Sequence, residues 1–445
     1  MSIRTLTLTI LLVVPAIALL AVGPKHRDPV PPGRTVVRYW EKWTGVEGAA
    51  IETLVDRFNA TAGAAAGVWV EYSAVSNIEQ RLLIAIAGGD PPDVAGLVDS
   101  RIPQYADQNA LLGLDELVRE RGIQLDSFKP IWIDLCRYDG RLYALPSTPF
   151  TIALFYNRTL FREAGLDPDS PPRTLDELNA AAVKLTKRDA TGRITQLGFT
   201  VSNAMLGWWP WVWPGFYGGR LWDGRRYCLD SPEGRAAAAW IGELRATLDP
   251  QRCIDFESTA GAIESAQNPF MAGKLAMLFQ GPWFSNWIRK YTPELDYAVA
   301  PFPSATAGGG NVFASEDVFV VPRGAPRPAE AMIFLKWVTE QVQLEELCKS
   351  HGKVSPFRSP APAFFDGHPN PYVRVFDEMA TSPRAFGFPQ MPMWAQVESE
   401  LLAAHTRLLS GRQTPDAVVS ETQRRLDAVV SEYQRMAARR RGSGL

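Results

Sequence analysis

The chain has 445 residues, of which 46% are hydrophobic and 21% charged, and its formal net charge is -2. A chain of this length is too long to fold around a single hydrophobic core, which indicates two lobes or domains. The composition is that of a globular protein, and the near-zero charge argues against nucleic acid as a partner, because a polyanion needs a basic surface. More than half of the 14 tryptophans lie between Trp208 and Trp287.

The N-terminus has the pattern of an export signal. An uncharged apolar run over residues 5–22 lies between basic residues. We expect residues 1–23 to be either a signal peptide, although Pro24 disfavours cleavage there, or a retained anchor, because a run of this length can just span a bilayer. No cysteine follows the run, which excludes a lipoprotein. Both alternatives place the chain in the periplasm or at the cell surface, beyond a Pro-rich linker over 24–33.

The first part of the exported chain alternates strands and helices. Apolar periodicity predicts strands over 36–40, 68–72 and 93–97, with helices over 51–58 and 78–86 between them. The second helix ends at a glycine pair. This βαβ alternation is typical of a parallel sheet covered by helices.

The rest of the chain continues the mixed pattern. An apolar strand is predicted over 152–156, and Thr174 to Glu177 forms a capping box before a helix. Ser231 followed by Pro232 starts another helix. A further strand and three further helices are predicted, at 318–321, from 328, over 394–409 and from 414. The basic tail, 436–445, is expected to be a frayed end.

Cysteine and histidine give no sign of a metal site. The four cysteines have no metal-binding spacing, and the four histidines are scattered. Cys228 and Cys253 are the closest pair for a disulfide in an exported protein, and the alternative is four buried thiols. We expect no metal and no cofactor.

Several short motifs occur in a characteristic order. They are Tyr39–Trp43, Ala87–Val94, Tyr143–Pro146, Leu154–Arg158, Phe161–Leu166, Met271–Met277 with Gly281-Pro282-Trp283, the Gly308–Gly310 turn, and Gly411–Thr414. Each motif is weak alone. The ordered set, which covers roughly residues 34–435, resembles the family 1 extracellular solute-binding proteins of bacterial ABC importers, the group that includes the maltose-binding proteins.

The resemblance implies an α/β fold with two lobes, of the type II periplasmic-binding-protein kind. Lobe one would hold 34–147 and 306–365, and lobe two would hold 151–300 and 370–435, including the C-terminal helices. Each lobe is then discontinuous, and hinge crossings join the two. The implied protein is a monomer that captures a mono- or oligosaccharide by hinge closure and passes it to the permease subunits of an ABC importer.

A sugar-binding site needs flat aromatic surfaces for the ring faces and polar groups for the hydroxyls. Trp283 is the strongest candidate, because it follows Gly-Pro and because the equivalent aromatic residue of maltose-binding proteins stacks on sugar; the alternative is an indole that fills the lobe. Two prolines exclude a helix interior near residue 210. At least one of Trp208, Trp209 and Trp211 is therefore expected to face the cleft.

Lobe one offers candidates where its strands end, which is where open α/β sheets bind ligands. Those at the first strand are Trp40, Glu41 and Trp43, and the alternative for the glutamate is a solvated loop acid. Those after the third strand are Asp99, Ser100 and Arg101. Maltose-binding proteins carry an Asp-Arg pair there, and the displaced position of Asp99 puts its role in doubt.

Three weaker signals complete the candidate site. Trp394 matches an aromatic ligand position loosely, and the alternative is a hydrophobic staple. Gly309 and Gly310 could bring backbone N–H groups to a ligand or form a plain hinge turn. Phe150 lies near where maltose-binding proteins present an acid, which argues against maltose itself.

No catalytic residues are expected. The chain has no GxSxG, HExxH, GxGxxG or P-loop motif. A secreted glycosidase or lyase remains the alternative among enzymes, because carboxylate pairs can always be found among 48 acids. Among binding proteins, the alternatives to a sugar are a polyamine, a peptide or a glycerol phosphodiester.

Overall fold

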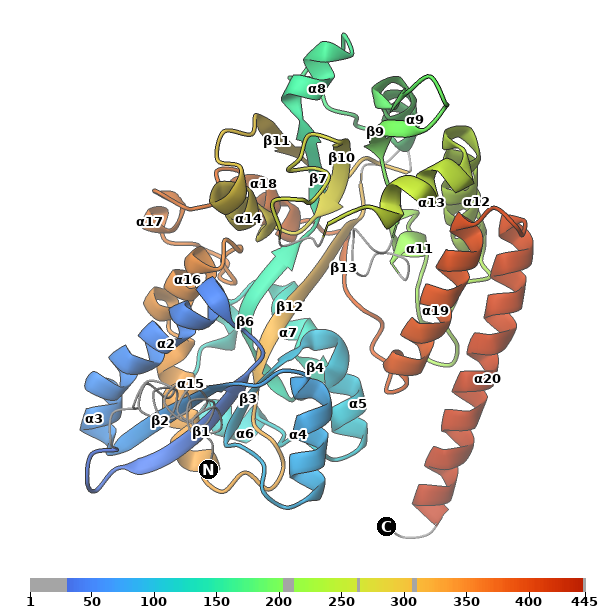
Figure 1. Cartoon of the computed structure of the whole chain (residues 1–445). Coiled ribbons are helices and arrows are strands. Elements are labelled where there is room, and N and C mark those ends of the chain that lie inside the picture. Colours follow the sequence, from blue (N-terminus) through green and yellow to red (C-terminus); the bar gives the residue numbers. More distant parts are fainter. Residues whose placement is uncertain (1–29, 203–211, 262–264, 306–309, 443–445) are drawn as a thin grey trace, which may run out of the picture.

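A computed structural model describes residues 30–202, 212–261, 265–305 and 310–442. The predicted fold class is confirmed, because the described residues form two α/β lobes, each built on its own sheet (Figure 1). The export segment and the tryptophans at 208, 209 and 211 lie outside the described residues, as does Gly309.

Lobe one contains the larger sheet. Its strands are β1 (Thr35–Glu41), β2 (Val68–Ala74), β3 (Val94–Val98), β6 (Ala144–Thr151), β12 (Val312–Val320) and β13 (Ala385–Phe386), in the order β13-β12-β3-β1-β2 with β6 also on β12. The first three strands are parallel, as the βαβ pattern predicts, while β12 runs antiparallel to β3 and β6. A separate hairpin joins β4 (Arg137–Tyr138) and β5 (Arg141–Leu142).

Helices of lobe one surround this sheet. They are α2 (Gly45–Ala60), α3 (Ala62–Ala66), α4 (Ile78–Ala87), η1 (Asp99–Arg101), α5 (Ile102–Asp107), α6 (Asp115–Arg121), η2 (Leu125–Ser127), α7 (Pro130–Leu135), α15 (Pro328–Val338) and α16 (Gln341–Ser350). Ile51, Leu54 and Phe58 lie at helical spacing in α2, within the helix predicted over 51–58, and all three are buried.

Lobe two is built on the sheet β11-β7-β10-β9-β8. Its strands are β7 (Ala153–Asn157), β8 (Lys187–Arg188), β9 (Ile194–Phe199), β10 (Leu275–Gln280) and β11 (Tyr297–Ala300), and its helices are α8 (Arg158–Glu163), α9 (Leu175–Leu185), α11 (Trp213–Phe216), α12 (Pro232–Leu248), α13 (Pro250–Ser258) and α14 (Phe284–Tyr291). The capping box of Thr174 and Glu177 is confirmed at α9, and Ser231 caps α12.

Two stretches of chain cross directly between the sheets. One residue separates β6 from β7, and the segment after β11 returns to lobe one as β12. A third connection carries α17 (Pro362–Phe365) and α18 (Val373–Ala380), which packs on β6 and β12. Strands β6 and β12 of the lobe-one sheet therefore lie next to the crossings, β6 before the first and β12 after the second.

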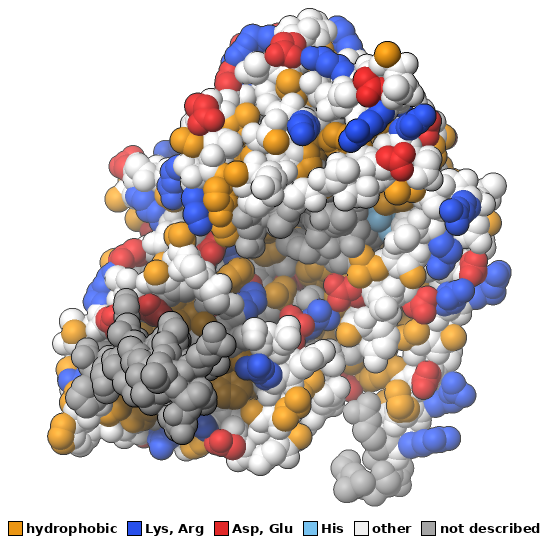
Figure 2. Space-filling model, viewed as in Figure 1, with side chains coloured by type: hydrophobic (Ala, Val, Ile, Leu, Met, Phe, Trp, Pro, Cys, Tyr) orange, Lys and Arg blue, Asp and Glu red, His pale blue; other side chains and the backbone are white. Residues whose placement is uncertain are grey.

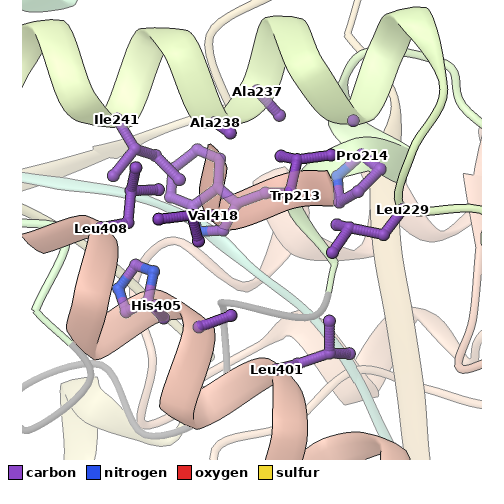
Figure 3. A pocket seen from close by; sticks show the side chains of 13 residues that line it. Trp213, Pro214, Leu229, Ala237, Ala238, Ile241, Leu401, His405, Leu408 and Val418 are labelled. Carbon is purple, nitrogen blue, oxygen red and sulfur yellow. The ribbon is translucent and has the colours of Figure 1, made fainter. Parts of the chain in front are cut away.

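The C-terminal helices α19 (Trp394–Leu409) and α20 (Pro415–Gly442) pack against α12. Figure 3 shows their apolar interface, where Trp213 and His405 lie close to a cavity of about 40 Å³. This cavity is too small for a sugar ring. Trp213 is 2% exposed, so its side chain packs in the core of lobe two.

Two expectations remain, one for the C-terminal tail and one for the cysteines. The tail does not fray before residue 442, because Ala and Arg are good helix formers and continue α20. All four cysteines are free thiols, and Cys253 is buried while Cys228 is partly exposed. The structure therefore has the four thiols of the alternative, but only three of them are buried.

Candidate functional site

A cavity of about 700 Å³ lies between the lobes. Figure 2 shows the surface hollowed there, with acidic and basic side chains inside the hollow. Lobe one contributes the loop from β1 into α2, the end of β3 and the middle of β12, whereas lobe two contributes α14 and the residue before it. This position at the carboxyl ends of β1 and β3 is where open α/β sheets bind ligands.

Aromatic side chains from both lobes face this cavity. Trp43 comes from the β1–α2 loop, and Trp283 precedes α14. The Trp283 ring meets Phe150 of β6 edge to face, with centroids 4.8 Å apart. Gly281 makes room for this indole, because a Cβ there would lie 2.2 Å from the ring. Both tryptophans are partly exposed, which leaves ring surface for a ligand.

The floor of the cavity is a buried ion-pair cluster centred on Asp317. Its carboxylate accepts hydrogen bonds from Lys353 Nζ, from Lys42 Nζ at 2.7 Å and from the Thr148 hydroxyl at 2.9 Å. Burial alone would raise the pKa of Asp317, but the two ammonium groups hold it well below its ordinary value. The Lys353 ammonium also lies 4.9 Å from the Trp43 ring and 5.7 Å from that of Trp283. The Lys353 ammonium therefore connects the ion-pair cluster to both tryptophan rings through cation–π contacts.

A second set of charges links lobe one to the C-terminal helices. Arg101 Nε lies 3.0 Å from Glu79 on α4, and its Nη2 lies 3.2 Å from Glu398 on α19. Farther from the cavity, the Tyr433 hydroxyl donates to Asp107 at 2.5 Å. Because α19 and α20 pack on lobe two, these contacts bridge the cleft.

Two predicted ligand carboxylates lie beneath the cavity surface. Glu41 is 1% exposed and accepts from the Lys42 amide at 2.8 Å and from the Tyr39 hydroxyl at 3.2 Å. Asp99 is fully buried and accepts from the Ser315 hydroxyl at 2.5 Å. Burial raises the pKa of both, to about 7 for Asp99. Neither carboxylate lines the cavity, because each is turned into the sheet to satisfy neighbouring donors.

Some of the other predicted site residues line the cavity and some do not. Ser100 and Arg101 line the cavity. Trp394 is 1% exposed and packs on Phe388, so it serves the core of the C-terminal helices instead of the cleft. Trp40 and Gly310 are described but do not line the cavity.

Sequence reasoning missed several residues that line the cavity. The charged ones are Lys42, Glu47, Glu79, Lys290, Asp317, Lys353 and Glu398, and the aromatic ones are Trp287, Tyr291 and Phe388. A signal for Trp287 and Tyr291 was present, because they follow Trp283 at steps of four residues. No local signal joins Lys42 to Asp317, which is 275 residues away.

The charged side chains that line the cavity are balanced. They are four cations (Lys42, Arg101, Lys290 and Lys353) and four anions (Glu47, Glu79, Asp317 and Glu398). Within the described ranges, no group of three or more metal-ligating side chains is placed to hold a metal ion. Nor do the described residues include a helix that combines the length and the apolarity needed to cross a membrane.

Known proteins of one family resemble this chain in sequence. The model of a family described as bacterial extracellular solute-binding protein matches residues 42–343. A binding protein of Brucella abortus (strain 2308) is 24% identical over 365 residues, which are 79% of this chain and 83% of that protein. The sn-glycerol-3-phosphate-binding periplasmic protein UgpB of Escherichia coli (strain K12) is 28% identical over 162 residues, 34% of this chain and 35% of its own.

Solved structures share the fold over most of the chain. CpMnBP1 with mannobiose bound has a TM-score of 0.77 and 25% sequence identity, and the match covers 89% of this chain and 99% of that one. The sugar-binding protein MalE from Xanthomonas citri has a TM-score of 0.74 at 19% identity, over 90% of this chain and 99% of its own.

Proposed function

The chain belongs to the bacterial extracellular solute-binding protein family, and from that premise we propose that its cleft binds a carbohydrate for delivery to an ABC importer. The observation that carries the proposal is the meeting of Trp43 from lobe one and Trp283 from lobe two in one cavity with a polar floor. Each platform that covers on the order of 50 Å² of a sugar face contributes roughly 1–1.5 kcal/mol of binding free energy.

The charge of the cavity favours an uncharged ligand. A polyamine needs surplus acids and a phosphate ester needs free cations, but the lining carries equal numbers of each. The cations at the floor already pair with Asp317, and Arg101 lies between two glutamates. Paired carboxylates can still accept hydrogen bonds from sugar hydroxyls, and paired ammonium groups can still donate to them.

Binding would act through the hinge. A sugar that touches both tryptophans gains its full contact only when the lobes are closed, so it shifts the population toward the closed form. The closed form would then dock on the permease. Binding is the whole task in this proposal, with no chemical step, and the exported chain is either freed by cleavage near residue 23 or tethered by the segment before it.

A binding screen tests the proposal. Because a ligand at 100 times its Kd adds roughly 2.7 kcal/mol to native stability, some neutral saccharide should raise the melting temperature by several degrees. Spermidine, dipeptides and glycerol 3-phosphate serve as controls and should have no effect. A shift from one of these controls with none from any saccharide would refute the carbohydrate assignment, and release of reducing ends would indicate an enzyme.

A further inference from the structure

An aromatic row runs along one face of α14 from its N-cap, and the site formed by Trp43 and Trp283 uses only the first member of this row. Trp283, Trp287 and Tyr291 are spaced by four residues, so they lie on the same side of the helix, about one turn apart. A stripe of this kind is usually core, but these three side chains are partly exposed and all line the cavity. The opposite face, which includes Phe284 and Ile288, supplies the core contact.

Neighbouring side chains contact each ring of the row. The Trp283 ring is held by Phe150 at the inner end. The rings of Trp287 and Tyr291 are nearly parallel, with planes 10° apart and centroids 6.5 Å apart. Lys290 places its ammonium 4.9 Å from the Tyr291 ring centroid at the outer end.

The length of this row can be compared with that of a glycan. Eight residues of helix rise about 12 Å, and one pyranose with its glycosidic oxygen advances by roughly one helical turn, about 5–6 Å. The row therefore has room for about three consecutive sugar rings. A cavity of about 700 Å³ lies in the upper half of the usual range for ligand sites, about 300–1,000 Å³. A single sugar ring would cover only one of the three aromatic side chains.

We propose that α14 forms a row of subsites and that the ligand is a linear, uncharged oligosaccharide of at least three residues. Trp283 holds the inner ring opposite Trp43, while Trp287 and Tyr291 hold the second and third rings and so determine the preferred chain length. This inference rests on the proposed carbohydrate function.

Calorimetric titration with two matched series tests it, one of β-1,4-linked mannose oligomers and one of α-1,4-linked glucose oligomers, each from one to four residues. In the series that binds, affinity should rise at each step up to three residues, by about 5- to 10-fold per ring, and then level off. Tyr291→Ala should weaken the trisaccharide by a similar factor and leave the disaccharide unchanged. Trp287→Ala should weaken both and leave the monosaccharide unchanged.

A control and the contrary outcomes separate the two proposals. Trp337→Ala removes a partly exposed tryptophan from α15, away from the cavity, and should leave every affinity unchanged. Thermal melts without ligand would show that each variant is folded. Affinity that does not depend on chain length, or equal losses for all lengths in Tyr291→Ala, would overturn the row of subsites and leave the carbohydrate function standing. If no saccharide in either series or in the wider screen binds, the function itself fails and the row with it.

Discussion

The two walls of the cleft hold their chemistry in different ways. On lobe one, Lys42, Asp317 and Lys353 converge from distant segments and fix one another by ion pairs. On lobe two, the aromatic row comes from a single helix whose other face anchors it in the core. The polar wall, which is the ion-pair cluster at the floor of the cavity, is therefore stable only when its charges are paired. In the aromatic wall, which is the row on α14, each ring can be removed separately.

This difference has a consequence for stability and binding. Removing one member of a buried ion-pair cluster leaves uncompensated charge and affects the whole lobe. Removing a partly exposed ring that faces a cavity loses ligand contact but opens no void in the core. Substitutions in the ion-pair cluster should therefore reduce folding stability, and substitutions in the aromatic row should reduce affinity.

The largest effect is expected from Asp317→Ala. Two ammonium groups would lose their shared carboxylate, and we expect the free energy of unfolding to fall by about 3–5 kcal/mol. Guanidinium denaturation of the unliganded protein measures this. The matched control is Lys290→Ala on the opposite wall, where the side chain is exposed and the change should stay within about 0.5 kcal/mol. Equal effects in the two variants would break the contrast between the walls.

A pH-dependent effect of intermediate size is expected beneath the polar wall. Burial raises the pKa of Asp99 to about 7, so the native state binds this proton more tightly than the unfolded chain does. The resulting stability is complete below about pH 4 and is lost as the pH rises through 7. Its loss should lower the free energy of unfolding by on the order of 2–4 kcal/mol.

Denaturation of wild type and Asp99→Asn across this pH range measures the effect as a difference. The comparison is needed because His351, His368 and His405 act oppositely: burial lowers their pKa values to about 3, 4 and 4, so they destabilise the fold as the pH falls below 6.5. Burial and the Asp99 charge also raise the pKa of Glu316, so Asp99→Asn removes part of this shift and the measured difference includes the coupling between the two carboxyls. Parallel pH profiles would show that the pKa of Asp99 is the same in the native and unfolded states, which contradicts the expected shift.

The smallest effect in this series concerns the aromatic wall. Trp283→Ala should cost roughly 1.5–3 kcal/mol of binding free energy, about 10- to 150-fold in affinity for the best saccharide, with little loss of unliganded stability. Gly281→Ala offers a second route, because its new methyl group would displace the same ring. Titration combined with denaturant melts separates binding from folding. A sharp fall in stability with affinity unchanged would place Trp283 in the core.

Local sequence determined most of the secondary structure and one wall of the cleft. The capping box at Thr174 and the Ser231 cap follow from neighbouring residues alone, because their hydrogen bonds close within three residues. Gly281-Pro282 placed Trp283 at a strand end in the same way. The spacing of Trp287 and Tyr291 was equally local and could have extended that prediction to the whole row.

Only the tertiary structure decided the polar wall and which candidates are buried. Lys353 reaches Asp317 across 36 residues and Lys42 reaches it across 275, distances over which no periodicity carries information. Glu41 and Asp99 stand at the predicted strand ends, but their carboxylates turn inward because donors from Tyr39 and Ser315 lie there. Whether a side chain at a strand end faces the ligand or the core depends on the element packed beside it, and that element is chosen by the fold.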